Sequence, residues 1–191
     1  MSSDIYISGS IGEPELYIEE LQTLREAQES DDVTLYINSV GGYVSTAIQI
    51  VNGIRNCKAK VTAVIEGECH SAATYIFLAC DEWVVNSGVL MLIHNYSGGA
   101  YGKGVDLIDS VKANDKWVKN IMATIYEGFL SPGELELVNS NKDIWLESEE
   151  ILTRLDNVVA LRDMNEEIDR EELRKQTLER VKELARSDEE S

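Results

Sequence analysis

Short runs rich in β-branched and aromatic residues recur in the first half of the chain, several of them bounded by Gly, Asn or Asp, as is typical of strands. The predicted strands are Ile5–Ile7, Val33–Ile37, Val61–Ile65, Trp83–Val85 and Val89–Ile93. Between them, apolar residues return every three or four positions, which predicts amphipathic helices over residues 18–24 and 44–54. Strand and helix therefore alternate, and this favours a parallel α/β domain.

A longer apolar stripe occupies residues 104–128 and predicts a helix of several turns that can project from the domain body. The chain then breaks, because Ser131-Pro-Gly-Glu134 has the form of a capping box with proline at the first helical position. A fresh helix is expected to begin there.

The composition changes from residue 165 onward to Glu, Arg, Lys and Asp around a thin apolar stripe. We expect a helix that docks weakly or not at all, and two interpretations stay open: an arm for partner binding or self-association, or a solvated helix with a frayed acidic end. The chain is accordingly divided into a domain over residues 1–161 and a charged helical extension over residues 162–191.

Charge and cysteine content narrow the class of protein. The 191 residues include 35 acidic and 17 basic ones, and a formal charge of −18 disfavours nucleic acid and anionic membrane surfaces as partners. Three cysteines without metal-ligand spacing, in a chain with no secretory leader, are expected to be reduced thiols. A cytoplasmic protein, without a membrane span or metal site, is the resulting expectation.

The chain contains only two histidines, His70 and His94, and a serine hydrolase near neutral pH usually needs an imidazole base. His94 is preferred, because it ends a predicted strand and so lies at the rim of the sheet, whereas His70 adjoins Ser71 and points elsewhere. Taken alone, His94 is equally well explained as a structural residue.

Ser71 follows a predicted strand and opens the apolar helix 72–80, so the helix dipole would favour negative charge developing on its hydroxyl. An N-cap serine that satisfies a backbone amide explains the same position equally well. Gly41 and Gly42 also stand between a strand and a helix; their amides could form an oxyanion hole, although a tight connection without a ligand is the commoner case. The glycine-rich segment 98–104 lacks the Ser or Thr of a nucleotide-binding loop after Lys103, so ATP could act only through a separate protein.

Four sequence blocks, taken in order, resemble the motifs of the ClpP peptidase family over about residues 5–161. They are Tyr36-Ile-Asn-Ser-Val-Gly-Gly42, Gly67-Glu-Cys-His-Ser71, Met91-Leu-Ile-His-Asn-Tyr-Ser-Gly-Gly99 and Asp143-Ile-Trp-Leu146. Val40 stands where the family has proline, and Ala72-Ala73 replaces the usual Met-Gly after the serine.

The resemblance implies a serine-type endopeptidase with Ser71 as nucleophile, His94 as base and Asp143 as the acid that orients the base. By itself Asp143 would be taken for a solvated loop acid. The family's oxyanion donors map to the backbone amides of Gly42 and Ala72, and its substrate-binding edge strand maps to Gly98 and Gly99. No cofactor is implied.

The family fold is a crotonase-like spiral of βαβ units, and the predicted helix after Gly104 occupies the place of its protruding handle. Two stacked heptameric rings, a tetradecamer, would enclose the active sites, and peptides or unfolded proteins would be cleaved with little sequence preference. The family's N-terminal segment, which couples to an unfolding ATPase, has no room ahead of the first strand, so such a partner is doubtful. The short form suits a virus-encoded or otherwise divergent member.

Two other classes compete with the peptidase: a catalytically silent subunit of a ClpP-like ring with a structural role, and a crotonase-like acyl-CoA enzyme. In the second, the amides of Gly41 and Gly42 would polarise a thioester carbonyl. An intact set of Ser71, His94 and Asp143 argues against the first, and the second leaves the serine and histidine positions unexplained.

Overall fold

A computed structural model describes the backbone of residues 1–99 and 101–189, with side chains described as far as Thr177. In this part of the chain, one sheet of six strands forms the centre of the molecule. The strands are β1 (Ser2–Ile11), β2 (Asp32–Gly42), β3 (Lys60–His70), β4 (Glu82–Val85), β5 (Leu90–Ile93) and β6 (Ile144–Glu147). Their order across the sheet is β1-β2-β3-β5-β6, and β4 pairs with the first half of β3.

The strands β1, β2 and β3 are parallel, and their side chains alternate between a buried and an open face. The buried face carries the aliphatic residues that the predicted strands supply, among them Ile7, Ile37 and Ile65, each no more than 1% exposed. On the open face, one register row crosses four strands through Tyr6, Tyr36, Val64 and Val84. The rings of Tyr6 and Tyr36 stack there with their centroids 5.2 Å apart.

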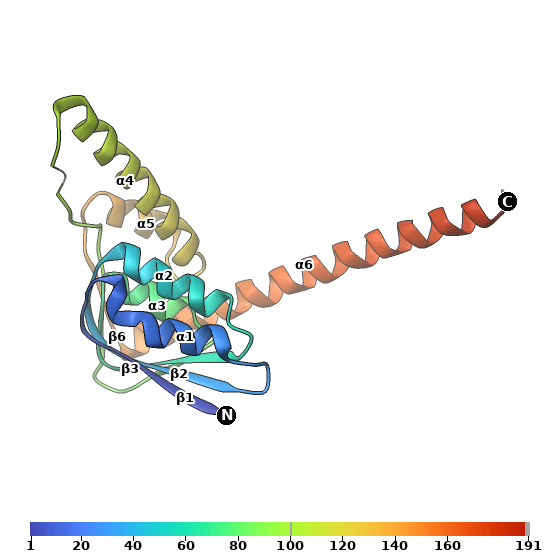
Figure 1. Cartoon of the computed structure of the whole chain (residues 1–191), viewed down its shortest axis with the longest axis horizontal. Coiled ribbons are helices and arrows are strands. Elements are labelled where there is room, and N and C mark those ends of the chain that lie inside the picture. Colours follow the sequence, from blue (N-terminus) through green and yellow to red (C-terminus); the bar gives the residue numbers. More distant parts are fainter. Residues whose placement is uncertain (100, 190–191) are drawn as a thin grey trace.

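Helices cover the buried face, as Figure 1 shows for the blue to green part of the chain. They are the short 3-10 helix η1 (Pro14–Tyr17), α1 (Ile18–Glu26), α2 (Val44–Arg55) and α3 (Ala72–Ala79). Because α2 presents apolar residues at helical spacing, it buries Ala47, Ile50, Val51 and Ile54 in the core, where it lies against α1 and α3. The predicted alternation of strands and helices is confirmed.

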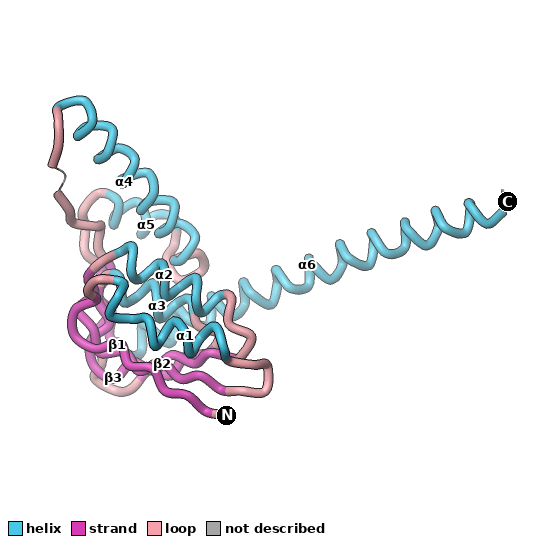
Figure 2. The backbone as a smooth tube through the Cα atoms, viewed as in Figure 1, coloured by secondary structure: helices cyan, strands magenta, loops and turns pink. Residues whose placement is uncertain are grey.

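The predicted long helix is α4 (Gly104–Ile125), which extends away from the sheet (Figures 1 and 2). Its last two turns bury Val118, Met122 and Ile125, whereas its first turns are largely exposed. The predicted capping box is confirmed at the start of α5 (Pro132–Asn139), where Ser131 Oγ accepts from Glu134 N and a carboxylate oxygen of Glu134 accepts from Ser131 N.

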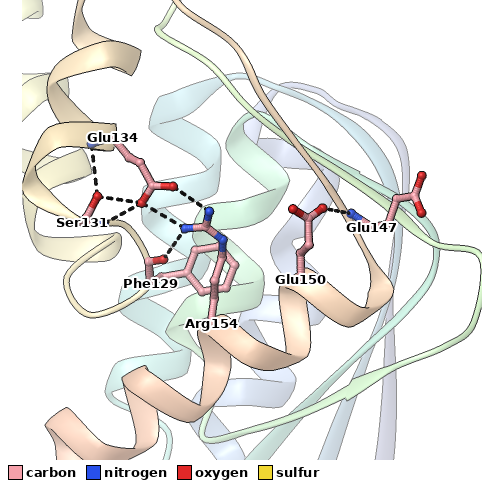
Figure 3. A network of polar contacts seen from close by, with 6 residues as sticks. All are labelled: Phe129, Ser131, Glu134, Glu147, Glu150 and Arg154. Atoms are coloured by element: carbon pink, nitrogen blue, oxygen red, sulfur yellow. Dashed lines mark hydrogen bonds and ion pairs between the residues drawn. The ribbon is translucent and has the colours of Figure 1, made fainter.

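The strand β6 was not predicted, and it is antiparallel to β5 in an otherwise parallel sheet. It leads directly into α6 (Ser148–Glu189), one continuous helix that runs through the expected domain boundary at residues 161 and 162. Near its start, Arg154 ties α6 to Glu134 of α5 (Figure 3). Residues 190 and 191 of the expected acidic end lie outside the described residues.

The three cysteines are not paired with one another. Cys69 and Cys80 are buried among apolar side chains, and this burial raises the pKa of both thiols well above the ordinary value. They are therefore poor nucleophiles. No helix within the described ranges is both long and apolar enough to cross a bilayer.

Candidate active site

Ser71 occupies a sharp turn between the last residue of β3 and the first residue of α3. Its backbone dihedrals are φ 55° and ψ −127°, a region that residues with side chains rarely adopt. The turn is held on both sides: Ser71 N donates to the carbonyl of Leu92 in β5 at 2.8 Å, and Ser71 O accepts from Thr74 N at 2.9 Å. Strain of this kind persists only where the surroundings enforce it, and it is concentrated at functional sites.

The same geometry argues against the capping interpretation of Ser71. An N-cap serine would accept a hydrogen bond from an amide in the first turn of α3, but Ser71 Oγ makes no such capping bond. Its side chain is half-buried and remains available to another partner. The local structure is that of a strained strand-to-helix elbow that presents a hydroxyl, as nucleophile elbows do.

His94 and Asp143 are brought together by the pairing of β5 with β6. The last antiparallel pair of that ladder joins Ile93 to Ile144, so His94 and Asp143 are the next residues outward on the two strands. The neighbouring ladder pairs His70 of β3 with Leu92 of β5, which places Ser71 beside the end of β5. Three strand ends therefore converge, one for each expected member of the triad.

No hydrogen bond connects Ser71, His94 and Asp143 with one another among the side chains that the structure describes. His94 is half-buried and Asp143 is exposed. Catalytic hydrogen bonds are often longer or poorly aligned before substrate binds. The fold thus brings the three residues to one place without closing the contacts between them. His70, the other histidine, is buried edge-on against Trp145, with ring centroids 5.5 Å apart.

Asn95, which no sequence pattern singles out, connects the segment after His94 to the segment before Asp143. Its Nδ2 donates to the carbonyl of Asn139 at 3.3 Å and to Asn141 Oδ1 at 2.9 Å, while its Oδ1 accepts from Tyr96 N at 2.9 Å. Asn141 has φ 64°, and within the described ranges it and Ser71 are the non-glycine residues with positive φ. Of these two residues, Ser71 is itself an expected catalytic residue, and Asn141 lies two positions before Asp143. An isolated asparagine gives no sequence signal for such a connection.

The glycine turn at the end of β2 lies directly against the Ser71 elbow. A Cβ atom on Gly41 would stand 2.5 Å from His70 O, 2.8 Å from Ser71 Cβ and 3.0 Å from Ala72 N, and Gly41 has φ +83°. Glycine is required here for both reasons. Gly41 therefore packs closely against the Ser71 elbow, and not only toward a possible ligand. This packing brings the turn that contains Gly42 next to the amide of Ala72.

A buried pair of hydroxyls supports the elbow from behind. Thr74 Oγ1 lies 2.7 Å from Ser71 O, to which it donates, and 2.6 Å from the hydroxyl of Tyr126 at the end of α4. Tyr126 is 1% exposed, and its burial raises the pKa of the phenol well above the ordinary value. The hydroxyl is therefore neutral, and the pair links α4 to the backbone of Ser71.

A cavity of about 550 Å³ opens between the start of α2, the segment after His94 and α4. It reaches the Gly42 turn, but Ser71, His94 and Asp143 are not among the residues that line it. Its lining includes Gly42, Tyr43, Gly98, Gly99 and Trp117. Gly42 and the Gly98-Gly99 pair, expected as oxyanion and substrate-binding residues, thus line one hollow. A larger cavity of about 720 Å³ lies near Trp83 and Arg162 and is lined by none of these residues.

The resemblance placed Gly98 and Gly99 in an edge strand, but residues 94–99 have no regular secondary structure. The pair has no neighbouring strand in a single chain, and two glycines lose more conformational entropy than other residues when fixed in a strand. The segment lines the cavity as an irregular loop.

Comparisons with known proteins show the family to which the sequence is similar. The family model described as Clp protease matches residues 2–160. The chain is 27% identical over 153 residues to the ATP-dependent Clp protease proteolytic subunit 3 of Rhizobium meliloti (strain 1021), and 26% identical over the same length to the protein of that name from Rhizobium etli. In both cases the match covers 78% of each chain.

Proposed function

This chain belongs to the Clp protease family, and we propose that it is a serine-type endopeptidase whose nucleophile is Ser71. The observation that carries the proposal is the strained turn at Ser71, which leaves the hydroxyl without a capping bond where β3, β5 and β6 converge. A serine that merely caps a helix would not need φ 55° or the glycine packed against it.

The chemistry then requires only residues at this convergence and in the glycine turn that packs against it. His94 takes the proton of the Ser71 hydroxyl as its oxygen attacks the peptide carbonyl, and Asp143 fixes the imidazole tautomer and stabilises the imidazolium. The tetrahedral oxyanion receives hydrogen bonds from the amides of Gly42 and Ala72, and loss of one such donor typically costs on the order of 10²-fold in rate. His94 then protonates the leaving amine, and water, activated by the same imidazole, hydrolyses the acyl-enzyme.

The substrate in this proposal is an extended peptide lying in the cavity beside Gly98 and Gly99. Main-chain hydrogen bonds to that segment would favour unfolded polypeptide over a particular sequence. The loop is irregular in the single chain, so we propose that substrate or a second copy of the chain orders it as a strand.

Ring assembly belongs to the same proposal. The first turns of α4 expose Val105, Ile108 and Val111, which recur every three residues and so form a stripe on one side of the helix. Apolar stripes of this kind are normally covered by another surface. Stacking of copies through α4 would bury the stripe and enclose the cavity that the helix borders. The relatives are named ATP-dependent, and any ATP used with this chain would be hydrolysed by a separate protein.

A silent ring subunit is the second candidate, and one observation favours it: the three catalytic side chains are not hydrogen-bonded to one another in the part of the chain described. Hydrolysis of fluorogenic peptides separates the two. We expect activity from the parent protein and from the Ser30→Ala control, an exposed turn serine, but none from Ser71→Ala or His94→Ala at unchanged particle size. Equal activity in the parent and Ser71→Ala would contradict the peptidase.

A further inference from the structure

The C-terminal helix leaves the domain body after Arg162. The Arg162 guanidinium donates to the carbonyls of Leu78 and Cys80 at 3.1 Å each and lies 4.5 Å from the centroid of the Trp83 ring. From residue 163 to Thr177 every side chain is exposed, and the helix continues to Glu189. We call residues 163–189 the arm; at 1.5 Å per residue it extends about 40 Å, as the red end of the chain shows in Figure 1.

The arm has little to hold it as an isolated helix. Met164, Ile168 and Leu173 are 52%, 49% and 65% exposed. The ion pair between Arg170 and Glu166, four residues apart, has both side chains about two-thirds exposed and so contributes little to stability. Helices in proteins owe most of their stability to packing of an apolar face. A helix of this length, continuous and uncovered, indicates a surface that another helix covers.

The charges along the arm indicate which helix covers it. Residues 163–172 contain six acidic residues and one basic residue, a net charge of −5, whereas residues 174–186 contain five basic and two acidic residues, a net charge of +3. A parallel pair of arms would set each segment against its like. An antiparallel pair would set acidic against basic twice. We propose that the arm binds the arm of a second copy of this chain in antiparallel orientation.

Helical periodicity gives the register of this pair. Residues 161, 164, 168, 171, 175, 178, 182 and 185 follow the alternating three- and four-residue spacing of a coiled-coil seam. The proposed antiparallel pair is centred on residue 173, which lies opposite residue 173 of the second copy. In this register Ile168 faces the position of Leu178, and Glu171 faces Lys175, of the second copy. The symmetric pair repeats both contacts. Three of the eight seam residues are charged, namely Glu171, Lys175 and Lys182, so charge as well as apolar contact defines the pair. Leu173, Val181 and Leu184 lie off this seam and are not explained by it.

Engineered thiols test the orientation in the full-length protein. Met164 faces position 182 of the other copy, and about 27 Å separates the two positions along one helix. After mild oxidation of a mixture of the Met164→Cys and Lys182→Cys proteins, we expect a disulfide between the two introduced thiols, identified by peptide mass spectrometry. Either protein alone should give no more cross-link than the parent, which retains the native cysteines. Cross-linking of Met164→Cys to itself, or none in the mixture, would overturn the proposal.

Charge reversal tests the cause. Glu171→Lys and Lys175→Glu each place like charges opposite each other in an antiparallel pair, and mixing the two proteins restores opposite charges across the pair, although each chain keeps its altered helix. Two exposed charge pairs should change the equilibrium constant for pairing of the arms by a factor on the order of three. The introduced cysteines Met164→Cys and Lys182→Cys are combined with each charge variant, and the yield of the disulfide between them is measured. We expect this yield to be at least about threefold higher in the mixture of the two charge variants than in either variant alone. An equal yield in all three would contradict pairing by charge.

Discussion

The network that joins Ser131, Glu134 and Arg154 connects the start of α5 to the base of α6, and its removal should have a measurable, pH-dependent cost (Figure 3). The Glu134 carboxylate accepts from both terminal nitrogens of Arg154, at 2.6 and 3.1 Å, and from Ser131 N and Oγ at 2.9 and 2.8 Å. Arg154 also donates to Phe129 O at 3.1 Å. The perturbation is Glu134→Gln, which keeps the shape of the side chain and removes its charge.

The hydrogen bonds from Arg154 are the main cause of a lowered Glu134 pKa, from 4.5 to about 2. A shift of that size corresponds to roughly 3 kcal/mol if taken at full value. The Glu134 side chain is 30% exposed, and solvent screening reduces the expected contribution to about 1–2 kcal/mol. Because the pKa is lower in the folded protein, this stability is present above about pH 4.5 and is lost as the pH falls toward 2.

The assay is urea unfolding followed by tryptophan fluorescence at fixed protein concentration, at pH 7, 5 and 3. We expect Glu134→Gln to lower the free energy of unfolding by about 1–2 kcal/mol at pH 7, and the difference from the parent to shrink at pH 3. Glu136→Gln, an exposed position on the same helix, should have little effect at any pH. A difference between parent and Glu134→Gln that stays constant from pH 7 to pH 3 would refute the electrostatic reasoning.

Substitutions at two further positions, Asn95 and Gly41, test how the site is positioned. Asn95→Ala and Asn95→Asp both lose the donor that joins the His94 and Asp143 segments, so peptide hydrolysis should fall on the order of tenfold in kcat with assembly intact; an unchanged kcat in both would show that the connection is dispensable. Gly41→Ala must displace the Ser71 elbow, whereas Gly88→Ala, at a similar φ of +78° but with open space around it, imposes backbone strain alone. Thermal unfolding and kcat should therefore suffer more in Gly41→Ala, and equal losses in the two would exclude the contact.

The sheet and its helices were predictable because burial imposes a period on the sequence. Ile50 and Ile54 recur at helical spacing because one side of α2 faces the core. β6 could not be found in this way: its four residues carry no period of their own and become a strand only by pairing with β5. The long helix α4 was found because its stripe extends over several turns, whereas the unbroken length of α6 was not, since its residues change from buried to fully exposed along the helix.

The candidate site was less accessible to sequence reasoning than the fold. Whether Ser71 caps a helix or presents its hydroxyl depends on its φ and ψ, which its neighbours in sequence do not determine. The placement of His94 next to Asp143 depends on the register of two strands far apart in the chain. The resemblance supplied these residues as expectations, and Asn95 stayed unnoticed because its partners come from a separate segment.

The most direct test of the account is reaction of the assembled protein with a fluorescent fluorophosphonate, read by intact mass and peptide mapping. An activated serine forms a covalent adduct with this reagent, whereas ordinary surface serines do not react. We predict one adduct per chain, on Ser71, that is absent in Ser71→Ala and strongly reduced in His94→Ala. Assembled protein that stays unlabelled, or that is labelled equally in Ser71→Ala, would contradict the assignment of Ser71 as the nucleophile.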